Sequence, residues 1–482
     1  MAKFPNRSDT SLIDVPVEVL SNIINYLSLS ERCNISSTCR HLYDAFNHSQ
    51  SWQTLELATS RRYDANFQQT ITYCPEQYNS IISKYGTYIK TIRIIMSDVL
   101  TDFKGLERIL AILSQKCRPE KILLKFSSNW SYACRYVLKG DSPPIDHIML
   151  LIGSFFESID SSRLKSIVID SWPHTKEMSI AATFVTTLMN IQNIIDIEHL
   201  LLWPSPLQQH NYGLASCTLQ LINHFAHLTA IGLNVSMLTN ELIGHLSKSQ
   251  RSKLKTIKIR ITDIRSVSEE INPFSWELFT NINPHVRLEF TVIDSVTNQD
   301  LDKVLSPCCL LSKIMFNETA RCDVRIINSL VSKYYKSLET FIVYCELADC
   351  DIELIMMVRK CKLLHTMIIG PSSNNCCYQG TINFKTLEKM AIIHGKTWNI
   401  FQFHESIISF VDRMNIEQDN SFDTVASMDS RGFYLKNLQR FHNEPTGDER
   451  RQKCTTLLES ILRLGFNIRC GSIVSTKTID ET

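Results

Sequence analysis

The sequence predicts an α/β protein in which three short N-terminal helices are followed by a solenoid, with parallel strands on the concave side and helices on the convex side. Two observations lead to this prediction. An apolar helical run lies near the start of the chain, and short segments rich in Ile and Leu recur downstream at intervals of 23 to 33 residues. One short strand per unit at a nearly constant period is typical of a solenoid.

The composition is that of a folded protein without an unusual charge. The chain has 482 residues, more than one hydrophobic core usually organises. Lys and Arg total 50 and Asp and Glu total 49, so charge predicts neither nucleic acid nor an anionic membrane as a partner. The longest apolar run, at 148–156, is too short to span a bilayer, and the start lacks the apolar stretch of a secretory signal. We expect a cytoplasmic or nuclear protein.

Sixteen cysteines raise the question of disulfides or zinc. A reducing compartment favours free thiols. The sequence has no CxxC pair, and its closest groupings are Cys308–Cys309, Cys376–Cys377 and Cys345 with Cys350. Structural zinc usually requires two ligand pairs at short spacing. We therefore expect buried thiols that act as small apolar residues, with no metal and no other cofactor.

The first predicted helix begins after Asp14, which is placed to cap it, and Pro16 suits its first turn because the missing N–H is not needed there. Val19, Leu20, Ile23, Ile24 and Leu27 then recur at helical spacing and form one apolar stripe.

Two more helices are predicted directly after the first. Ser28 and Glu31 fit a capping box that starts the second helix, which carries Cys33 or Ile35 inward. The third carries Cys39, Leu42, Tyr43 and Phe46. Three helices in about 40 residues are too small to bury all of this apolar surface among themselves. The pattern alone leaves open whether the excess is a docking face or packs on the next domain.

This segment resembles the F-box, the helical module that docks proteins onto the Skp1-type adapter of cullin ubiquitin ligases. The pattern covers about 45 residues, a tenth of the chain. The matches are Pro16, Glu18, Val19, Leu20, Ile23, Ile24, Leu27, Glu31, Cys39, Arg40 and Trp52. The departures are Val15, Thr38, Leu42 and Ser51, where the family has Leu, Val, Trp and Leu. Of these, Ser51 removes an apolar contact, which lowers the expected affinity for the adapter.

The resemblance implies ten adapter contacts in this chain. They are Val15, Pro16, Val19, Leu20, Ile23, Ile24, Leu27, Ile35, Cys39 and Leu42. It also implies a cullin scaffold that is reached through the adapter, and a protein substrate that is bound elsewhere on the chain.

The downstream segments share the template apolar-x-x-apolar-x-apolar, which resembles the strand motif of leucine-rich repeats. Cys308 and Cys361 precede the first apolar anchor by three residues, as in the cysteine-containing subtype often joined to F-boxes. The asparagine or cysteine expected after the strand is replaced at Trp172, Ser236 and Thr262. An ordinary α/β domain, in which strands and helices also alternate, is the alternative. The predicted strands are at 89–94, 121–126, 164–169, 197–202, 228–233, 254–259, 286–293, 311–316, 338–343, 364–369 and 387–392.

These patterns divide the chain into five segments. We expect a flexible tail at 1–11, an F-box at 12–60, an irregular junction with the first repeats at 61–160, a repeat solenoid at 161–400 and a C-terminal cap with polar loops at 401–482. Within the cap, 454–466 has the pattern of an amphipathic helix.

Positions between the core anchors of each strand should face the concave side and offer a binding surface. Aromatic residues, Met and Arg dominate protein interfaces. The candidate substrate contacts are Trp203, Asn234, Lys258, Arg260, Met315 and Tyr344. The densest basic cluster consists of Arg251, Lys253, Lys255, Lys258, Arg260 and Arg265, which is either a solvated edge or a patch for an acidic or phosphorylated partner.

The sequence contains none of the motifs GxGxxG, GxxxxGK[ST], HExxH or GxSxG, and we expect no catalytic residues. The resemblance implies a substrate-recognition subunit of a Skp1–cullin–F-box ubiquitin ligase. A repeat scaffold that uses its F-box only for protein interaction is the alternative. A hydrolase in the C-terminal region is a third possibility and would need a pocket with convergent polar groups.

Overall fold

The computed structural model of the chain describes most of the residues up to 370 and a few beyond. The described residues are 12–58, 61–63, 69–71, 75–96, 103–126, 145–172, 185–189, 196–204, 212–248, 252–262, 270–345, 347, 350–370, 382–383, 386, 389–390, 393, 400–403, 408–409 and 468–470. The expected tail at 1–11, the expected helix at 454–466, and Arg251 and Arg265 of the basic cluster lie outside them.

The N-terminal helical module, residues 12–52, contains the three predicted helices. They are α1 (Val17–Asn25), α2 (Leu29–Ser36) and α3 (Arg40–Asn47), with short 3-10 turns η1 (Leu12–Asp14) and η2 (Ser49–Trp52). The capping box of α2 is confirmed, because Ser28 Oγ accepts from the Glu31 N–H and the Glu31 carboxylate accepts from the Ser28 N–H at 2.7 Å. The start of α1 differs from the prediction: Pro16 is the N-cap residue, and no side chain caps the helix.

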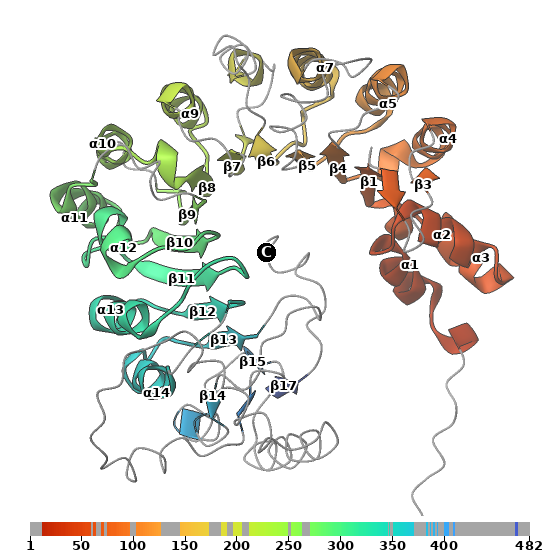
Figure 1. Ribbon diagram of the computed structural model, residues 1–482. Coiled ribbons are helices and arrows are strands. Elements are labelled where there is room, and N and C mark those ends of the chain that lie inside the picture. Colours follow the sequence, from red (N-terminus) through yellow and green to blue (C-terminus); the bar gives the residue numbers. More distant parts are fainter. Residues whose placement is uncertain are drawn as a thin grey trace, which may run out of the picture. The chain divides into compact units, whose positions relative to one another are not determined.

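The chain forms two compact units, which are described separately, and the module belongs to the first. The first comprises 1–238 and 251–255, and the second comprises 239–250 and 256–482. Each contains a parallel sheet whose strands alternate with helices, and the helices lie on one face of the strands (Figure 1). This arrangement is an α/β solenoid, as predicted.

In the first unit the strand order follows the sequence and every neighbouring pair in this sheet is parallel. A short antiparallel pair, β2 (Arg61–Tyr63) and β3 (Gln69–Ile71), stands apart from the sheet. The sheet strands are β1 (Thr54–Ala58), β4 (Thr91–Met96), β5 (Lys121–Phe126), β6 (Ser166–Trp172), β7 (His199–Pro204) and β8 (Ala230–Asn234). The other elements are α4 (Pro75–Tyr85), η3 (Gly86–Tyr88), α5 (Phe103–Lys116), α7 (Ile145–Ser158), α9 (Tyr212–His224) and η5 (Val235–Met237).

The second unit repeats this plan with seven described strands in the order β9-β10-β11-β12-β13-β15-β17. They are β9 (Thr256–Ile261), β10 (Arg287–Val292), β11 (Leu311–Phe316), β12 (Thr340–Val343), β13 (Thr366–Ile369), β15 (Ile400–Phe403) and β17 (Ile468–Cys470), with β14 (Ile382–Asn383) paired separately to β16 (Ile408–Ser409). The helices are α10 (Asn240–Lys248), α11 (Pro273–Ile282), α12 (Asn298–Val304), α13 (Val324–Tyr334) and α14 (Asp351–Lys360).

The repeating template explains why these strands form. Its first apolar residue is buried two positions before the strand, as at Leu164, Leu228 and Leu254, and the alternate strand positions are buried beneath the helices. Strand β9, for example, buries Ile257 and Ile259. Period-two burial of Ile and Leu is what a half-buried strand requires.

One predicted strand is wrong. The template at 387–392 was expected to be extended, but the described residues Lys389 and Met390 are helical, and the next strand of the sheet is β15. A short apolar run fits a buried helix as well as a strand, so spacing alone did not separate the two. The span expected to be an irregular junction, 61–160, contains β4, α5, β5 and α7.

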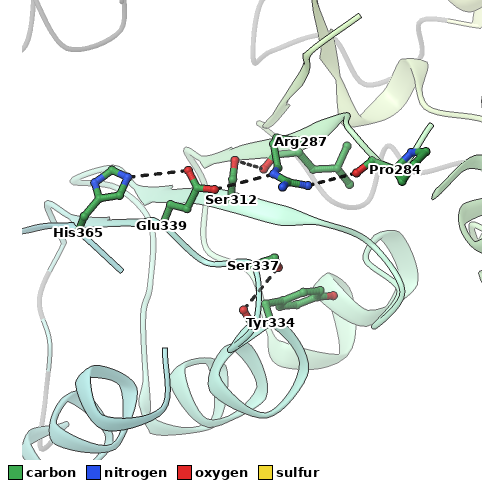
Figure 2. A network of polar contacts seen from close by, with 8 residues as sticks. Pro284, Arg287, Ser312, Tyr334, Ser337, Glu339 and His365 are labelled. Carbon is green, nitrogen blue, oxygen red and sulfur yellow. Dashed lines mark hydrogen bonds and ion pairs between the residues drawn. The ribbon is translucent and has the colours of Figure 1, made fainter. Parts of the chain in front are cut away.

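A ladder of polar contacts links residues at or just before the starts of the sheet strands. In the first unit, Lys165 N donates to Glu120 O, and the Lys165 ammonium lies 3.0 Å from Glu198. In the second unit, the Glu339 carboxylate lies 3.8 Å from both Arg287 Nε and His365 Nε2, as Figure 2 shows. These groups are more than a third exposed, so each ion pair contributes at most about 1 kcal/mol.

Among the described residues, no helix has the length and apolarity needed to cross a membrane. Nor does that part of the chain bring three or more His, Cys, Asp or Glu side chains into a group able to hold a metal ion. Among the cysteines of that part, Cys117, Cys322 and Cys361 are buried.

Candidate functional site

The helical module has a small apolar core of its own. Leu20 and Ile24 of α1 pack with Ala45 of α3 and are at most 4% exposed. Five half-buried residues surround them: Val15, Val17, Ile35, Leu42 and Phe46. Two of the predicted adapter contacts, Leu20 and Ile24, therefore lie inside the module and hold α1 against α3.

The opposite side of α1 is apolar and exposed. Val19 is 47% exposed and Ile23 is 54% exposed, and Tyr26, directly after the helix, is 81% exposed. These three residues are spaced i, i+4 and i+7, which places them along one stripe. We call Val19, Ile23 and Tyr26 the α1 stripe. Large apolar side chains gathered on a surface are typical of an interaction site.

The structure divides the ten predicted adapter contacts into three groups by exposure. Exposed residues are Pro16, Val19, Ile23 and Cys39; half-buried residues are Val15, Leu27, Ile35 and Leu42; buried residues are Leu20 and Ile24. The single apolar stripe seen in the sequence is thus shared between an inner face of α1, with Leu20 and Ile24, and an outer face. Whether the ten residues contact an adapter stays a prediction.

Sequence reasoning missed two exposed tyrosines. Tyr26 continues the spacing of Val19 and Ile23, so the helical period would have found it. Tyr43 was expected to point inward from α3 and is 52% exposed. Cys39, also expected to face inward, is exposed. Of the two alternatives for α2, Ile35 packs against the core and Cys33 is exposed.

A buried arginine holds the module together and was not foreseen. Arg32 of α2 is 4% exposed and donates from Nε to Leu27 O (2.8 Å), from Nη1 to Ser51 O (2.7 Å) and from Nη2 to Asn25 O (2.7 Å). Asn25 and Leu27 lie at the C-terminal end of α1, where backbone carbonyls lack helical partners and a cation is favoured. Burial lowers the pKa of Arg32 to about 10, so the group is still charged at neutral pH.

Ser51 is a second internal link of the module, and whether it lowers adapter affinity stays a prediction. Its side chain is fully buried and donates to Ala45 O at 2.6 Å. Ser21 Oγ lies 3.1 Å from the same carbonyl and 2.6 Å from Val17 O. Ser51 therefore joins η2 to α3 inside the module.

An aromatic cluster joins the module to the first helix of the solenoid. The Trp52 indole is buried and stacks on Tyr85 of α4, with ring centroids 4.4 Å apart, and it meets Phe46 of α3 edge-on at 4.9 Å. Trp52 Nε1 donates to Phe46 O at 2.7 Å, and the Tyr85 hydroxyl donates to Asn47 Oδ1 at 2.6 Å. These contacts together hold helix α3 of the module against helix α4 of the solenoid.

The module also covers one edge of the first sheet. The Thr54 N–H at the start of β1 donates to Asn25 Oδ1 at 3.0 Å, and the Tyr78 hydroxyl of α4 donates to Glu56 O at 3.2 Å. An unprotected edge strand is a template for pairing with other chains. The module provides a partner for the Thr54 N–H and α4 provides one for the Glu56 carbonyl, so both pack against the first strand of the solenoid.

The predicted substrate contacts lie on the strand face opposite the helices, but most are buried. Trp203 is 8% exposed, Met315 is 4%, Tyr344 is 2% and Asn234 is 1%. Neighbouring strands place apolar side chains side by side: Trp203 packs with Leu123, Val168 and Leu201, and Met315 with Ile342, Tyr344 and Ile368. The prediction that these four side chains face solvent is wrong.

Lys258 and Arg260 of β9 remain half-buried on that same face. The Lys258 ammonium lies 3.6 Å from Glu289 of β10, directly opposite it in the parallel register. Lys253 and Lys255 are exposed in the first unit. Within the basic cluster, the charge of Lys258 is therefore neutralised by Glu289. Whether the candidate substrate residues bind a partner stays a prediction.

The comparison with protein families agrees with the module's geometry. A family model for F-box-like domains matches residues 12–58, which include α1, α2, α3 and η2. No curated protein matches the chain. The match covers the segment that holds the α1 stripe, the Arg32 contacts and β1.

Proposed function

We propose that this chain is the substrate-recognition subunit of a Skp1–cullin–F-box ubiquitin ligase. The F-box-like domain supports a role in protein interaction, and F-box domains generally bind Skp1-type adapters. The observation that carries the proposal is the α1 stripe, an exposed apolar surface on that domain. The cullin scaffold is reached through the adapter, and the protein acts in the cytoplasm or the nucleus.

In this proposal the chain performs no bond chemistry. The solenoid, which resembles leucine-rich repeats, holds a protein substrate, while the F-box-like domain holds the adapter. Keeping a substrate lysine close to the ubiquitin-charged enzyme raises its effective concentration, and this proximity is the receptor's contribution to rate.

Replacing Val19 and Ile23 together with Asp should strongly weaken adapter binding. Both side chains are about half exposed and make no part of the module's core, so the domain stays folded while the docking surface becomes charged. Interface hot spots cost about 2 kcal/mol or more when removed, so we expect a loss of affinity of about 30-fold or more. The measurement is affinity for a purified Skp1-type adapter by calorimetry.

The control is Leu150→Asp, which puts one aspartate, against two in the double variant, in place of a 52% exposed leucine of α7 and should leave adapter affinity unchanged. Leu20 is unsuitable for this test because its side chain lies in the core of the module. Unchanged affinity in the Val19→Asp/Ile23→Asp variant would remove the α1 stripe from the docking surface.

The alternative is a scaffold that binds the adapter but directs no ubiquitination. Inhibiting cullin neddylation in cells should separate the two functions. Proteins bound to a ligase receptor accumulate when the ligase stops, so proximity labelling should recover them in larger amounts from inhibited cells. Labelling that is the same with and without the inhibitor favours the scaffold. The Val19→Asp/Ile23→Asp chain is the control, since it should show no inhibitor effect in either case.

A further inference from the structure

Helix α11 of the second unit carries an exposed apolar stripe that the solenoid does not use. Phe274 is 65% exposed, Leu278 is 41% exposed and Ile282 is 37% exposed. The other side of the helix is already anchored, because Trp276 and Phe279 are at most 2% exposed and Trp276 Nε1 donates to Val304 O at 2.9 Å. The exposed residues are therefore not needed to pack α11 against the rest of the unit.

The spacing of these residues is close to that of the α1 stripe. Phe274, Leu278 and Ile282 stand at i, i+4 and i+8, so they form one line along the whole helix. The other exposed large apolar residues described in this unit, Tyr335, Ile352 and Leu363, do not form a line along one helix. Scattered exposed apolar residues are normal on a protein surface, but a contiguous stripe indicates an interaction site.

Near the first half of this stripe the exposed charges are mostly acidic. Lys303 of α12, whose carbonyl accepts from the Ile271 N–H, is already paired with Asp300 at 3.2 Å. Between Arg265 and Arg287 the sequence has three Glu and neither Lys nor Arg. Glu277, next to Leu278 on the helix, and Glu270 are both exposed. Helix α10 adds the exposed Glu241 near the start of α11, where Asn240 Oδ1 accepts from the Asn272 N–H at 2.8 Å. A cationic partner is favoured at this end. Lys248 lies at the far end of α10.

We propose that the α11 stripe is a docking surface for an amphipathic helix of a partner protein, with apolar residues along one face and Lys or Arg beside them. An apolar stripe on a solenoid helix is matched by the apolar face of a second helix, and the flanking carboxylates select a basic one. The inference goes beyond the proposed function, because it concerns a surface in the second unit that adapter binding does not require.

The test uses two labelled synthetic peptides and the full chain. Each is a helix of about 18 residues, long enough to form in solution, with the same leucine stripe flanked by either Lys or Glu. Fluorescence anisotropy should show that the Lys peptide binds and the Glu peptide does not. Leu278→Asp should weaken binding of the Lys peptide about tenfold or more, and Glu277→Lys should shift preference toward the Glu peptide.

Two control variants locate the binding. Ile352→Asp changes a 58% exposed isoleucine of α14 and should leave the affinity unchanged, as should Val19→Asp/Ile23→Asp on the α1 stripe. Equal binding of both peptides, or losses in these controls as large as in Leu278→Asp, would overturn the proposal. A dimer of the chain that Leu278→Asp dissociates in sedimentation experiments would also overturn it and assign the stripe to a second copy. Adapter affinity is measured separately and is expected to be unchanged by the α11 variants, so failure of one proposal leaves the other testable.

Discussion

Replacing Arg32 with Met should destabilise the helical module by more than about 3 kcal/mol. The guanidinium donates to three backbone carbonyls, those of Asn25, Leu27 and Ser51, and a buried carbonyl left without a donor costs about 1–3 kcal/mol. Methionine fills similar volume but cannot donate, so the loss reflects these hydrogen bonds. Hydrogen-exchange mass spectrometry of peptides from 12–52 should show faster exchange in the variant.

Arg40 provides the matched control for this prediction. It begins α3 and is exposed, so Arg40→Met removes the same charge without taking a donor from a buried carbonyl. Surface changes of this kind usually alter stability by less than about 0.5 kcal/mol. If Arg32→Met and Arg40→Met exchange alike, the Arg32 contacts contribute little to the fold.

The burial of Arg32 and its hydrogen bonds could not be predicted from the sequence of the module. Helix spacing, the Ser28–Glu31 capping box and the ordered F-box matches were enough to predict three helices and a docking segment. An arginine, however, is usually exposed, and no local pattern shows that the end of one helix will meet the side chain of the next. The same limit applies to Ser51, whose partner Ala45 lies on a different element.

The strands were predicted well because their signal is local. A buried anchor followed by alternating apolar residues recurs in each repeat, and parallel pairing then follows from the period. The surface was predicted less well, because exposure depends on neighbouring strands. Trp203 and Met315 occupy positions expected to face outward, yet each packs into an apolar cluster across adjacent strands. The exposed stripe on α11 was missed because the buried and exposed residues of this helix are equally apolar, so the sequence does not show which of them face solvent.

Replacing Trp52 with Ala should loosen both the helical module and the first solenoid repeat. The indole stacks on Tyr85, meets Phe46 and donates to the Phe46 carbonyl, so its loss leaves a cavity between α3 and α4 and an unsatisfied acceptor. Substitutions of this type cost about 3–5 kcal/mol. Hydrogen exchange should accelerate in 12–52 and also in 75–96, because one aromatic cluster holds the two segments together.

Trp276 provides a control of the same size and burial. It is 1% exposed and its Nε1 also donates to a backbone carbonyl, Val304 O, so Trp276→Ala should accelerate exchange near α11 and leave 12–96 protected. If Trp52→Ala affects 12–52 alone, the module folds independently of the solenoid. If both segments respond, deleting the F-box-like domain would damage the first repeat as well. Surface variants such as Val19→Asp/Ile23→Asp are then the appropriate way to separate adapter binding from substrate binding.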